Sequence, residues 1–401
     1  MLATYFTSVA LTSTGYIATF TVASLAAPQL TGSRATSGLP SAVAVAGTAV
    51  AATILSALMA RRGRRAGIVT GLAIGSLGAL AGLVSVFVGS FALLLAGSLA
   101  IGFANSATQL TRYAAADLSP NARASALSLV VWGSTVGSVV GPNLVAPAGS
   151  IAPRLGWDPL AGGLALALAF VVAAWVVASL GPRAAEPVHH GPEADAGHGA
   201  RTLTLLRDML AGVAGRSAVL ALASGQLVMV LVMTMTPLHL HENGHGLEVV
   251  GFVIGAHTLG MFGVAPISGR LTDRFGAPLV IGAGFAMLAL AGVLAALTPA
   301  SGGVMLSGPL FLLGAGWSFT FVAGSSLLSA AGSLSERARL QGATDALTWT
   351  VAALSGLASG VVLDLIGFEL MAVAGAVIAV LLGLVVAIDR RPRPAAATSP
   401  R

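Results

Sequence analysis

Residues 269–276 read Gly-Arg-Leu-Thr-Asp-Arg-Phe-Gly, a charged segment at the junction of two long apolar stretches, 248–270 and 277–298. Each stretch is about as long as the ~20 residues that a helix needs to cross the hydrocarbon of a bilayer. Glycine permits a tight turn, and a charged turn between two such helices belongs at a membrane surface. We therefore expect a fold of membrane-spanning helices joined by short polar loops.

The composition of the whole chain agrees with this expectation. Of 401 residues, 56% are hydrophobic and 8% are charged, and the mean hydropathy is +0.91. Soluble domains carry about 25% charged residues, so this chain has too few to cover itself for water. Long runs of Ala, Gly, Leu and Val favour helices over the alternating strands of a β-barrel. Cysteine is absent, which excludes disulfides, thiolate metal sites and cysteine nucleophiles.

Apolar stretches of spanning length recur along the chain and predict an all-α membrane protein with twelve transmembrane helices in two six-helix bundles. The predicted spans are 4–30, 38–60, 67–89, 91–112, 124–147, 159–181, 217–240, 248–270, 277–298, 303–330, 340–364 and 367–388. They define an N-terminal bundle (1–181), a cytoplasmic linker (182–216), a C-terminal bundle (217–390) and a disordered cytoplasmic tail (391–401). The first span lacks a basic leader and a cleavage site, so we expect it to be retained.

The basic residues predict the orientation of these helices. All 20 are arginine, and with alternating loops 18 of them fall on one side, including Arg112 and Arg123 between spans four and five. Only Arg34 and Arg154 fall on the other side. The positive-inside rule then predicts a multi-pass protein of the bacterial inner membrane with both termini in the cytoplasm. The arginines form no single patch, so we expect the lipid bilayer, and not nucleic acid, as the surrounding partner.

The charged turn at 269–276 is also similar to a motif of a known protein family. It resembles the Gly-x-x-x-Asp-Arg-x-Gly loop of major facilitator transporters, and the matching residues are Gly269, Asp273, Arg274 and Gly276. The resemblance implies a conformational-switch loop, in which Asp273 caps the following helix and pairs with arginine until the two halves rock. The related turn at 60–65 keeps Gly63 but has Ala60 in place of the aspartate. Segment 137–142, Gly-Ser-Val-Val-Gly-Pro, resembles a second motif of the superfamily.

Four side chains in spans seven and eight could bind a soft metal. Met229 and Met233 are spaced i, i+4, as are His257 and Met261, so each pair lies on one face of its helix. Counted from the outer ends of the two spans, the pairs match in depth and could form two facing rungs near mid-membrane. Thioether and imidazole suit copper, Cu(I) especially. The residues alone leave open a metal site or a buried histidine among packing methionines.

The same pattern resembles the signature of CcoA-like copper importers, a bacterial branch of the superfamily. This resemblance implies that Met229, Met233, His257 and Met261 bind copper as transported substrate, with no resident cofactor. It implies an alternating-access importer, not an enzyme, that supports cytochrome oxidase assembly. We expect a monomer that delivers copper to a copper chaperone. Some proteins of this branch resemble riboflavin importers, so riboflavin or another small organic solute is an alternative substrate.

Three histidines follow the outer part of span seven. His239, His241 and His245 lie within seven residues and could recruit a metal from the periplasm. The alternative is a solvated polar loop in which histidine is tolerated. An organic solute would instead use aromatic and amide groups, for which the sequence offers Trp132, Asn143, Gln226, Trp317 and Trp349.

A proton-coupled drug exporter is the remaining alternative. The glycine–proline motif of segment 137–142, which resembles one often seen in antiporters, favours this alternative. Such exporters usually carry an arginine within span four, and we expect none there, which disfavours it. Asp345, in span eleven, is either a proton site or a plain helix-end group near cytoplasmic Arg339. The helix-end interpretation is the one that the sequence favours.

Overall fold

The computed structural model describes residues 2–33, 36, 39–181, 204, 207–245, 247–330 and 334–388. All regular elements within these ranges are helices. Most of the predicted linker 182–216 and the whole predicted tail 391–401 lie outside the described residues.

Six long helices form the N-terminal half: α1 (Leu2–Thr31), α2 (Leu39–Arg62), α3 (Arg64–Val88), α4 (Phe91–Leu118), α5 (Arg123–Ile151) and α6 (Pro159–Leu180). A short 3₁₀ turn, η2 (Ala152–Leu155), follows α5. Glycines at positive φ terminate or separate several of these helices, for example Gly63 between α2 and α3.

The C-terminal half begins with α8 (Val213–Glu242). Its next crossing is assembled from α9 (Leu247–Thr258), a π-helical turn η4 (Leu259–Gly263) and α10 (Ala265–Phe275). Then come α11 (Ala277–Leu297), a 3₁₀ turn η5 (Gly303–Leu306), α12 (Ser307–Ser329) and α13 (Leu334–Ile388). The backbone of α13 leaves helical geometry at Gly367 (φ 76°), so this element contains two crossings.

The predicted fold is confirmed. Among the described residues, ten helical segments are long and apolar enough to cross a membrane. That number counts α13 once and leaves out α5, whose 29 residues exceed the spanning length. Adding α5 and the second crossing of α13 gives the twelve spans expected from the sequence. Most boundaries agree within a few residues, but α4 continues to Leu118, well past the predicted end of span four at residue 112.

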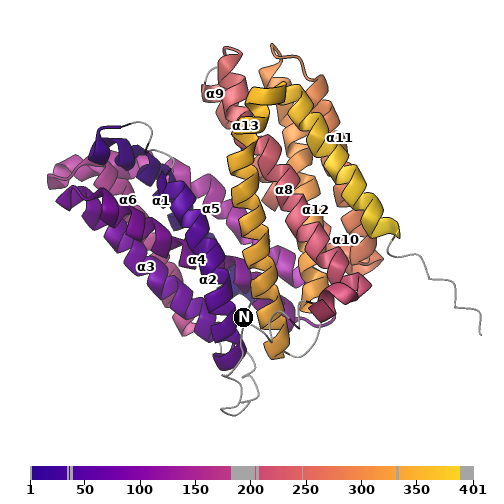
Figure 1. The fold of residues 1–401 in the computed structure, drawn as a ribbon. Helices are drawn as coiled ribbons and strands as arrows, with labels where there is room; N and C mark the ends of the chain where they lie inside the picture. The colour runs from indigo at the N-terminus through magenta and orange to yellow at the C-terminus, as the bar shows by residue number, and fades with distance from the viewer. Residues whose placement is uncertain are drawn as a thin grey trace, which may run out of the picture.

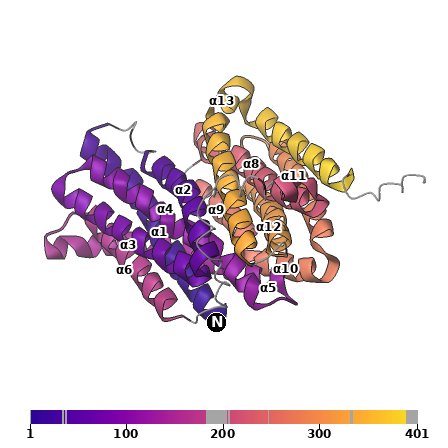
Figure 2. The ribbon, with the colours of Figure 1, turned by 60° about the horizontal axis from the view of Figure 1, so that its bottom comes forward.

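The two halves stand side by side and approach each other toward the end at which α1 begins (Figure 1; Figure 2 shows this end turned toward the viewer). We call this the arginine-rich end, because α2 finishes there with Arg61 and Arg62 and α3 starts there with Arg64 and Arg65. The main helix contacts between the halves are those of α2 with α13 and of α5 with α10.

Small residues allow these contacts to be close. The backbone of Gly342 in α13 lies against Ser56 of α2, and that of Gly269 in α10 lies against Ser128 of α5. A Cβ added to either glycine would come within 2.7 Å of a backbone carbonyl oxygen, that of Ala52 or Ala124. The two crossings are thus sterically equivalent, as expected of two pseudo-symmetric halves.

Candidate functional site

The three predicted methionine ligands pack against one apolar cluster that joins both halves. Met229, on α8, is buried within this cluster, and Met233, one turn further on, packs against its edge. Met261 also packs against it, from the π-helical turn η4. Single π turns occur frequently at functional sites because they displace side chains from the regular helical register.

The imidazole of His257 is directed toward α12. It is 2% exposed, and its Nδ1 lies 2.9 Å from the carbonyl oxygen of Leu310. A carbonyl only accepts hydrogen bonds, so Nδ1 carries the proton and Nε2 of the neutral ring offers a lone pair. This Nε2 is buried and has no hydrogen-bond partner among the described residues.

Helix α12 lies against both α8 and the α9–η4 segment. The backbone of α12 at Gly314 lies directly against the backbones of His257 and Met261, because glycine has no side chain to keep them apart. The structure therefore gathers the three methionines around one cluster and fixes His257 by a hydrogen bond to the intervening helix. The two facing rungs of ligands remain a prediction.

An amide and three aromatic rings form a second group beside these residues. Trp317 of α12 donates from Nε1 to Gln226 Oε1 of α8 over 2.7 Å. Its ring stacks on Phe321 with centroids 4.4 Å apart, and the Phe262 ring meets it edge-on at 5.7 Å. Gln226 and Trp317 were candidates for an organic-solute site, and the structure brings these two together.

The other candidates for an organic-solute site do not join this group. Trp132 lies in the N-terminal half with its ring centroid 5.7 Å from that of Phe6. Trp349 is half-buried in α13, and the side chain of Asn143 lies outside the described ones. Only the Gln226–Trp317 pair therefore supports the idea of a polar-aromatic site.

A buried ion pair crosses between the halves. Arg112 Nη2 of α4 lies 2.7 Å from Asp345 Oδ1 of α13, and the hydroxyl of Tyr113 donates to the same oxygen over 3.1 Å. Arg112 is 2% exposed and Asp345 is 3% exposed. Two expectations from the sequence are therefore wrong: Arg112 is not a loop charge, and Asp345 is not a solvated helix-end group.

Further contacts hold the guanidinium of Arg112. In its own half it donates to the backbone carbonyl of Gln109, lies 3.3 Å from Gln109 Oε1 and donates to the hydroxyl of Tyr113 over 2.8 Å. In the other half it donates to Ser325 Oγ over 3.1 Å and lies 4.3 Å from the ring centroid of Phe321. An arginine is thus present within the fourth span, which removes the argument made from the sequence against an exporter.

The aspartate of the charged turn contacts the N-terminal half, and not a helix of its own half. The carboxylate of Asp273 accepts hydrogen bonds from the backbone N–H groups of Ala124 (3.1 Å) and Ser125 (2.8 Å), at the N-terminus of α5. Its expected role as a cap of the following helix is wrong, because α11 starts after Gly276 without a side-chain cap. A carboxylate at a helix N-terminus satisfies unpaired N–H groups and interacts favourably with the helix dipole.

The remaining residues of the turn have separate roles. Gly276 adopts φ 85°, as Gly63 does with φ 86° in the related turn, a backbone conformation that favours glycine. Arg274 is exposed, with its guanidinium 5.2 Å from the ring centroid of Phe275. Of the four residues of the motif, Gly269 and Asp273 are the ones whose observed contacts reach α5 in the other half.

The turn that lacks the aspartate is served by another acid. Ala60 is buried, and Asp117 at the end of α4 supplies a carboxylate nearby. Its Oδ2 lies 2.9 Å from Arg64 Nε in the same half, and its Oδ1 lies 3.6 Å from Arg337 Nη1 of α13 in the other half. Asp117 therefore links three helices at the arginine-rich end.

The histidines predicted to recruit a metal make separate contacts. His239 stacks on Phe368 with ring centroids 4.0 Å apart, and His245 Nε2 lies 2.8 Å from the carbonyl oxygen of Ala300. The side chain of His241 lies outside the described ones. Within the described part of the chain, no three His, Asp or Glu side chains gather as a metal site would require.

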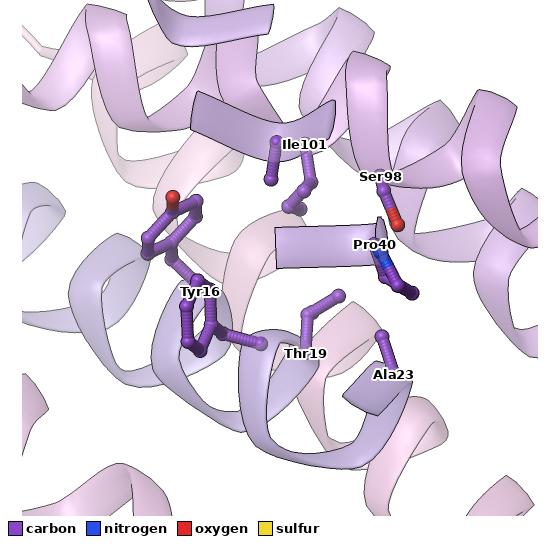
Figure 3. A pocket seen from close by; sticks show the side chains of 8 residues that line it. Tyr16, Thr19, Ala23, Pro40, Ser98 and Ile101 are labelled. Carbon is purple, nitrogen blue, oxygen red and sulfur yellow. The ribbon is translucent and has the colours of Figure 1, made fainter. Parts of the chain in front are cut away.

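A small pocket opens among α1, α2 and α4 (Figure 3). Its lining is nearly all apolar, and it has room for about one water molecule. The lining residues are Tyr16, Thr19, Phe20, Ala23, Pro40, Ala44, Ser98 and Ile101. The pocket is too small for an organic solute in this conformation.

Twelve spans in two halves, a charged turn that bridges the halves and a buried ion pair between them fit the architecture of an alternating-access carrier. The sequence matches the model of the Major Facilitator Superfamily over residues 5–349 and again over 218–401. The chain belongs to this superfamily and is a multi-pass membrane transporter.

Relatives agree with this assignment. The chain is 34% identical to the uncharacterized MFS-type transporter YddS of Bacillus subtilis, over 92% of this chain and 86% of the relative. It is 26% identical to the riboflavin transporter RfnT of Brucella anthropi, over 78% of this chain and 76% of the relative. The E. coli fucose:proton symporter FucP has a similar fold, with a TM-score of 0.77 at 16% identity and 98% coverage of both chains.

Proposed function

We propose that this transporter imports copper into the cytoplasm by alternating access. The observation that carries the proposal is the buried imidazole of His257, whose Nδ1 is held by Leu310 while Nε2 has no partner among the described residues. Metal-binding histidines commonly donate the N–H of their second ring nitrogen to a backbone carbonyl, which fixes the ring orientation and the tautomer.

The three methionines supply the remaining ligands of the proposal. Met229, Met233 and Met261 share one cluster, and their thioethers are soft donors that favour Cu(I). This set carries no charge, so it holds Zn²⁺ weakly and offers no oxygen to Mg²⁺ or Ca²⁺. Weak neutral ligands suit a transported ion, because the ion has to leave again.

The proposed route runs from the outer side toward the arginine-rich end, which the positive-inside rule assigns to the cytoplasm. Histidines 239, 241 and 245 would recruit copper at the outer side. The resemblance to CcoA-like importers extends the proposal to copper supply for cytochrome oxidase assembly.

Radioactive copper uptake by cells lacking their own importer tests the proposal. His257→Asn retains a donor for Leu310 but removes the Nε2 lone pair, so we expect initial uptake to fall about 10-fold or more. Met233→Leu preserves side-chain volume but removes a sulfur, and we expect a smaller loss. The matched control is Met235→Leu, because Met235 is two residues from Met233 on the same helix and does not pack against the cluster that the three proposed methionine ligands share.

Riboflavin, or a solute of similar aromatic character, is the second candidate. The stacked Trp317–Phe321 pair and the Gln226 amide offer the π surfaces and hydrogen bonds that a planar ring system requires, and RfnT is a riboflavin transporter. Riboflavin uptake measured in parallel decides between the candidates. Riboflavin uptake that depends on Gln226, with copper uptake unchanged by His257→Asn, would replace copper with an organic solute.

A further inference from the structure

Asp345 is the acidic residue that the structure buries most deeply within the described part of the chain. Of its two carboxylate oxygens, Oδ1 accepts from Arg112 and Tyr113, whereas Oδ2 is buried and has no hydrogen-bond partner among the described residues. A carboxylate offers about four lone-pair sites, so Oδ2 is the position at which a proton can add without displacing either existing contact.

The contacts of this ion pair are unequal between the halves. Arg112 has partners in both halves, and it keeps Gln109 and Tyr113 when the arginine-rich end opens. Both hydrogen-bond partners of Asp345, Arg112 and Tyr113, belong to the opposite half. Separation of the halves therefore leaves the arginine two hydrogen-bond partners in its own half but removes both of these contacts from the carboxylate.

A buried charge without a partner is strongly unfavourable, and a buried carboxyl group avoids this by taking up a proton. We propose that Asp345 is the coupling-proton site of this transporter. A proton adds to Oδ2, the neutral acid loses its attraction for Arg112, and the arginine-rich end can open. The proton leaves on the cytoplasmic side, and the ion pair forms again as that end closes.

The surroundings single out this one carboxyl group. Arg112 and Tyr113, both from α4, are the ionisable groups that act on Asp345. Helices α2, α8, α11 and α12 also pack against α13, and none of their described titratable side chains is among the groups that act on it. From α12, Ser325 and Phe321 contact the guanidinium and leave the carboxylate untouched.

The inference rests on the transport function but not on copper as the substrate, so its test needs no transported solute. The chain has no cysteine, which allows spin labels at two introduced cysteines without background. Arg62→Cys and Phe275→Cys place the labels on exposed residues of the two halves at the arginine-rich end. Their separation in lipid nanodiscs, measured by pulsed electron resonance, reports whether that end is open.

We expect acidification from about pH 8 to about pH 5 to shift the doubly labelled protein toward longer distances. Asp345→Asn mimics the neutral acid, so it should favour the long distance at every pH, with a population raised about 10-fold at neutral pH. Asp345→Glu keeps the carboxyl group and should keep the pH response, which also controls for folding. Asp364→Asn makes the same change at an exposed position of α13 and should behave as the parent protein.

A pH response that survives in Asp345→Asn, or a parent protein whose label distances ignore pH, would overturn the inference. The copper proposal is separate, because His257→Asn should lower copper uptake about 10-fold or more and leave the pH-dependent distance unchanged. Failure of copper uptake together with a pH response that requires Asp345 would remove the proposed substrate and retain the proton site.

Discussion

The α5–α10 contact and the α2–α13 contact join the same two halves at the same end of the molecule, yet different chemistry holds each together. In the first, the carboxylate of Asp273 caps the backbone of α5. Beside the second, on what we call the α2–α13 side, charged side chains of α3 and α4 meet those of α13: Asp117 lies between Arg64 and Arg337, and Arg112 pairs with Asp345. Both contacts have close backbone packing in common, because Gly269 and Gly342 each allow their helix to lie directly against a helix of the other half.

This difference determines what each contact contributes when the end opens. Asp273 is exposed, so its carboxylate can exchange the α5 amides for water at little cost. Asp345 and Arg112 are buried, so their separation has to be compensated by a change of charge or by new partners. The α2–α13 side therefore sets most of the energy that keeps this end closed, and the α5–α10 side adds a small and readily reversible part.

Among the changes that test this comparison, removal of the Asp117 carboxylate should cause the largest loss of stability. Asp117→Asn deletes the carboxylate shared by Arg64 and Arg337, and it leaves the nearly buried Arg64 without its counter-charge. Breaking a buried pair from one side costs about 3–5 kcal/mol, and the residual exposure places this case at about 3 kcal/mol. We expect a clear fall in the thermal unfolding temperature in detergent. An unchanged unfolding temperature would mean that the ion pairs are not what distinguishes the α2–α13 side.

Substitutions at the two close helix contacts should have the next largest effect on the stability of the closed end. Gly342→Ala and Gly269→Ala each place a Cβ within 2.7 Å of a backbone oxygen, which cannot move away as a flexible side chain could. Overpacking of this kind costs about 1–3 kcal/mol, here against the closed arginine-rich end. Labels at positions 62 and 275 should then report a larger open population in both variants.

The control for these glycines is Gly282→Ala in α11, because nothing lies within 4 Å of the added Cβ. Alanine is the better helix former by about 1 kcal/mol, so this variant should be as stable as the parent or slightly more so. An open population that rises equally in Gly282→Ala would show that backbone propensity, and not the crossing between the halves, controls the equilibrium.

The twelve spans could be predicted because hydropathy and arginine position are local properties of the chain. The positive-inside pattern, however, treats each arginine near the end of a span as solvated, and so it misplaced Arg112. The partner that buries it, Asp345, lies 233 residues further along the chain. No periodicity in one sequence links such positions.

The same limitation applies to the candidate site. The i, i+4 spacing predicted which methionine and histidine side chains share a helix face, and three methionines do pack against one cluster. The hydrogen bond of His257 to Leu310 and that of Trp317 to Gln226 both depend on where α12 lies. Helix packing of that kind arises from side-chain shape over the whole bundle, which local patterns do not encode.

Asp273→Asn should have the smallest effect and sharpens the comparison most directly. The amide keeps one oxygen acceptor for the α5 amides but loses the negative charge at the helix N-terminus, so we expect a loss of about 1 kcal/mol or less. The label distances should show an open population raised by about fivefold at most, with little change in the unfolding temperature. The double variant Asp273→Asn with Asp117→Asn should add the two effects, because Asp273 binds the backbone of α5 whereas Asp117 binds the side chains of Arg64 and Arg337. Strong non-additivity would mean that the two contacts open as one unit, and the proposed division of labour between them would then be wrong.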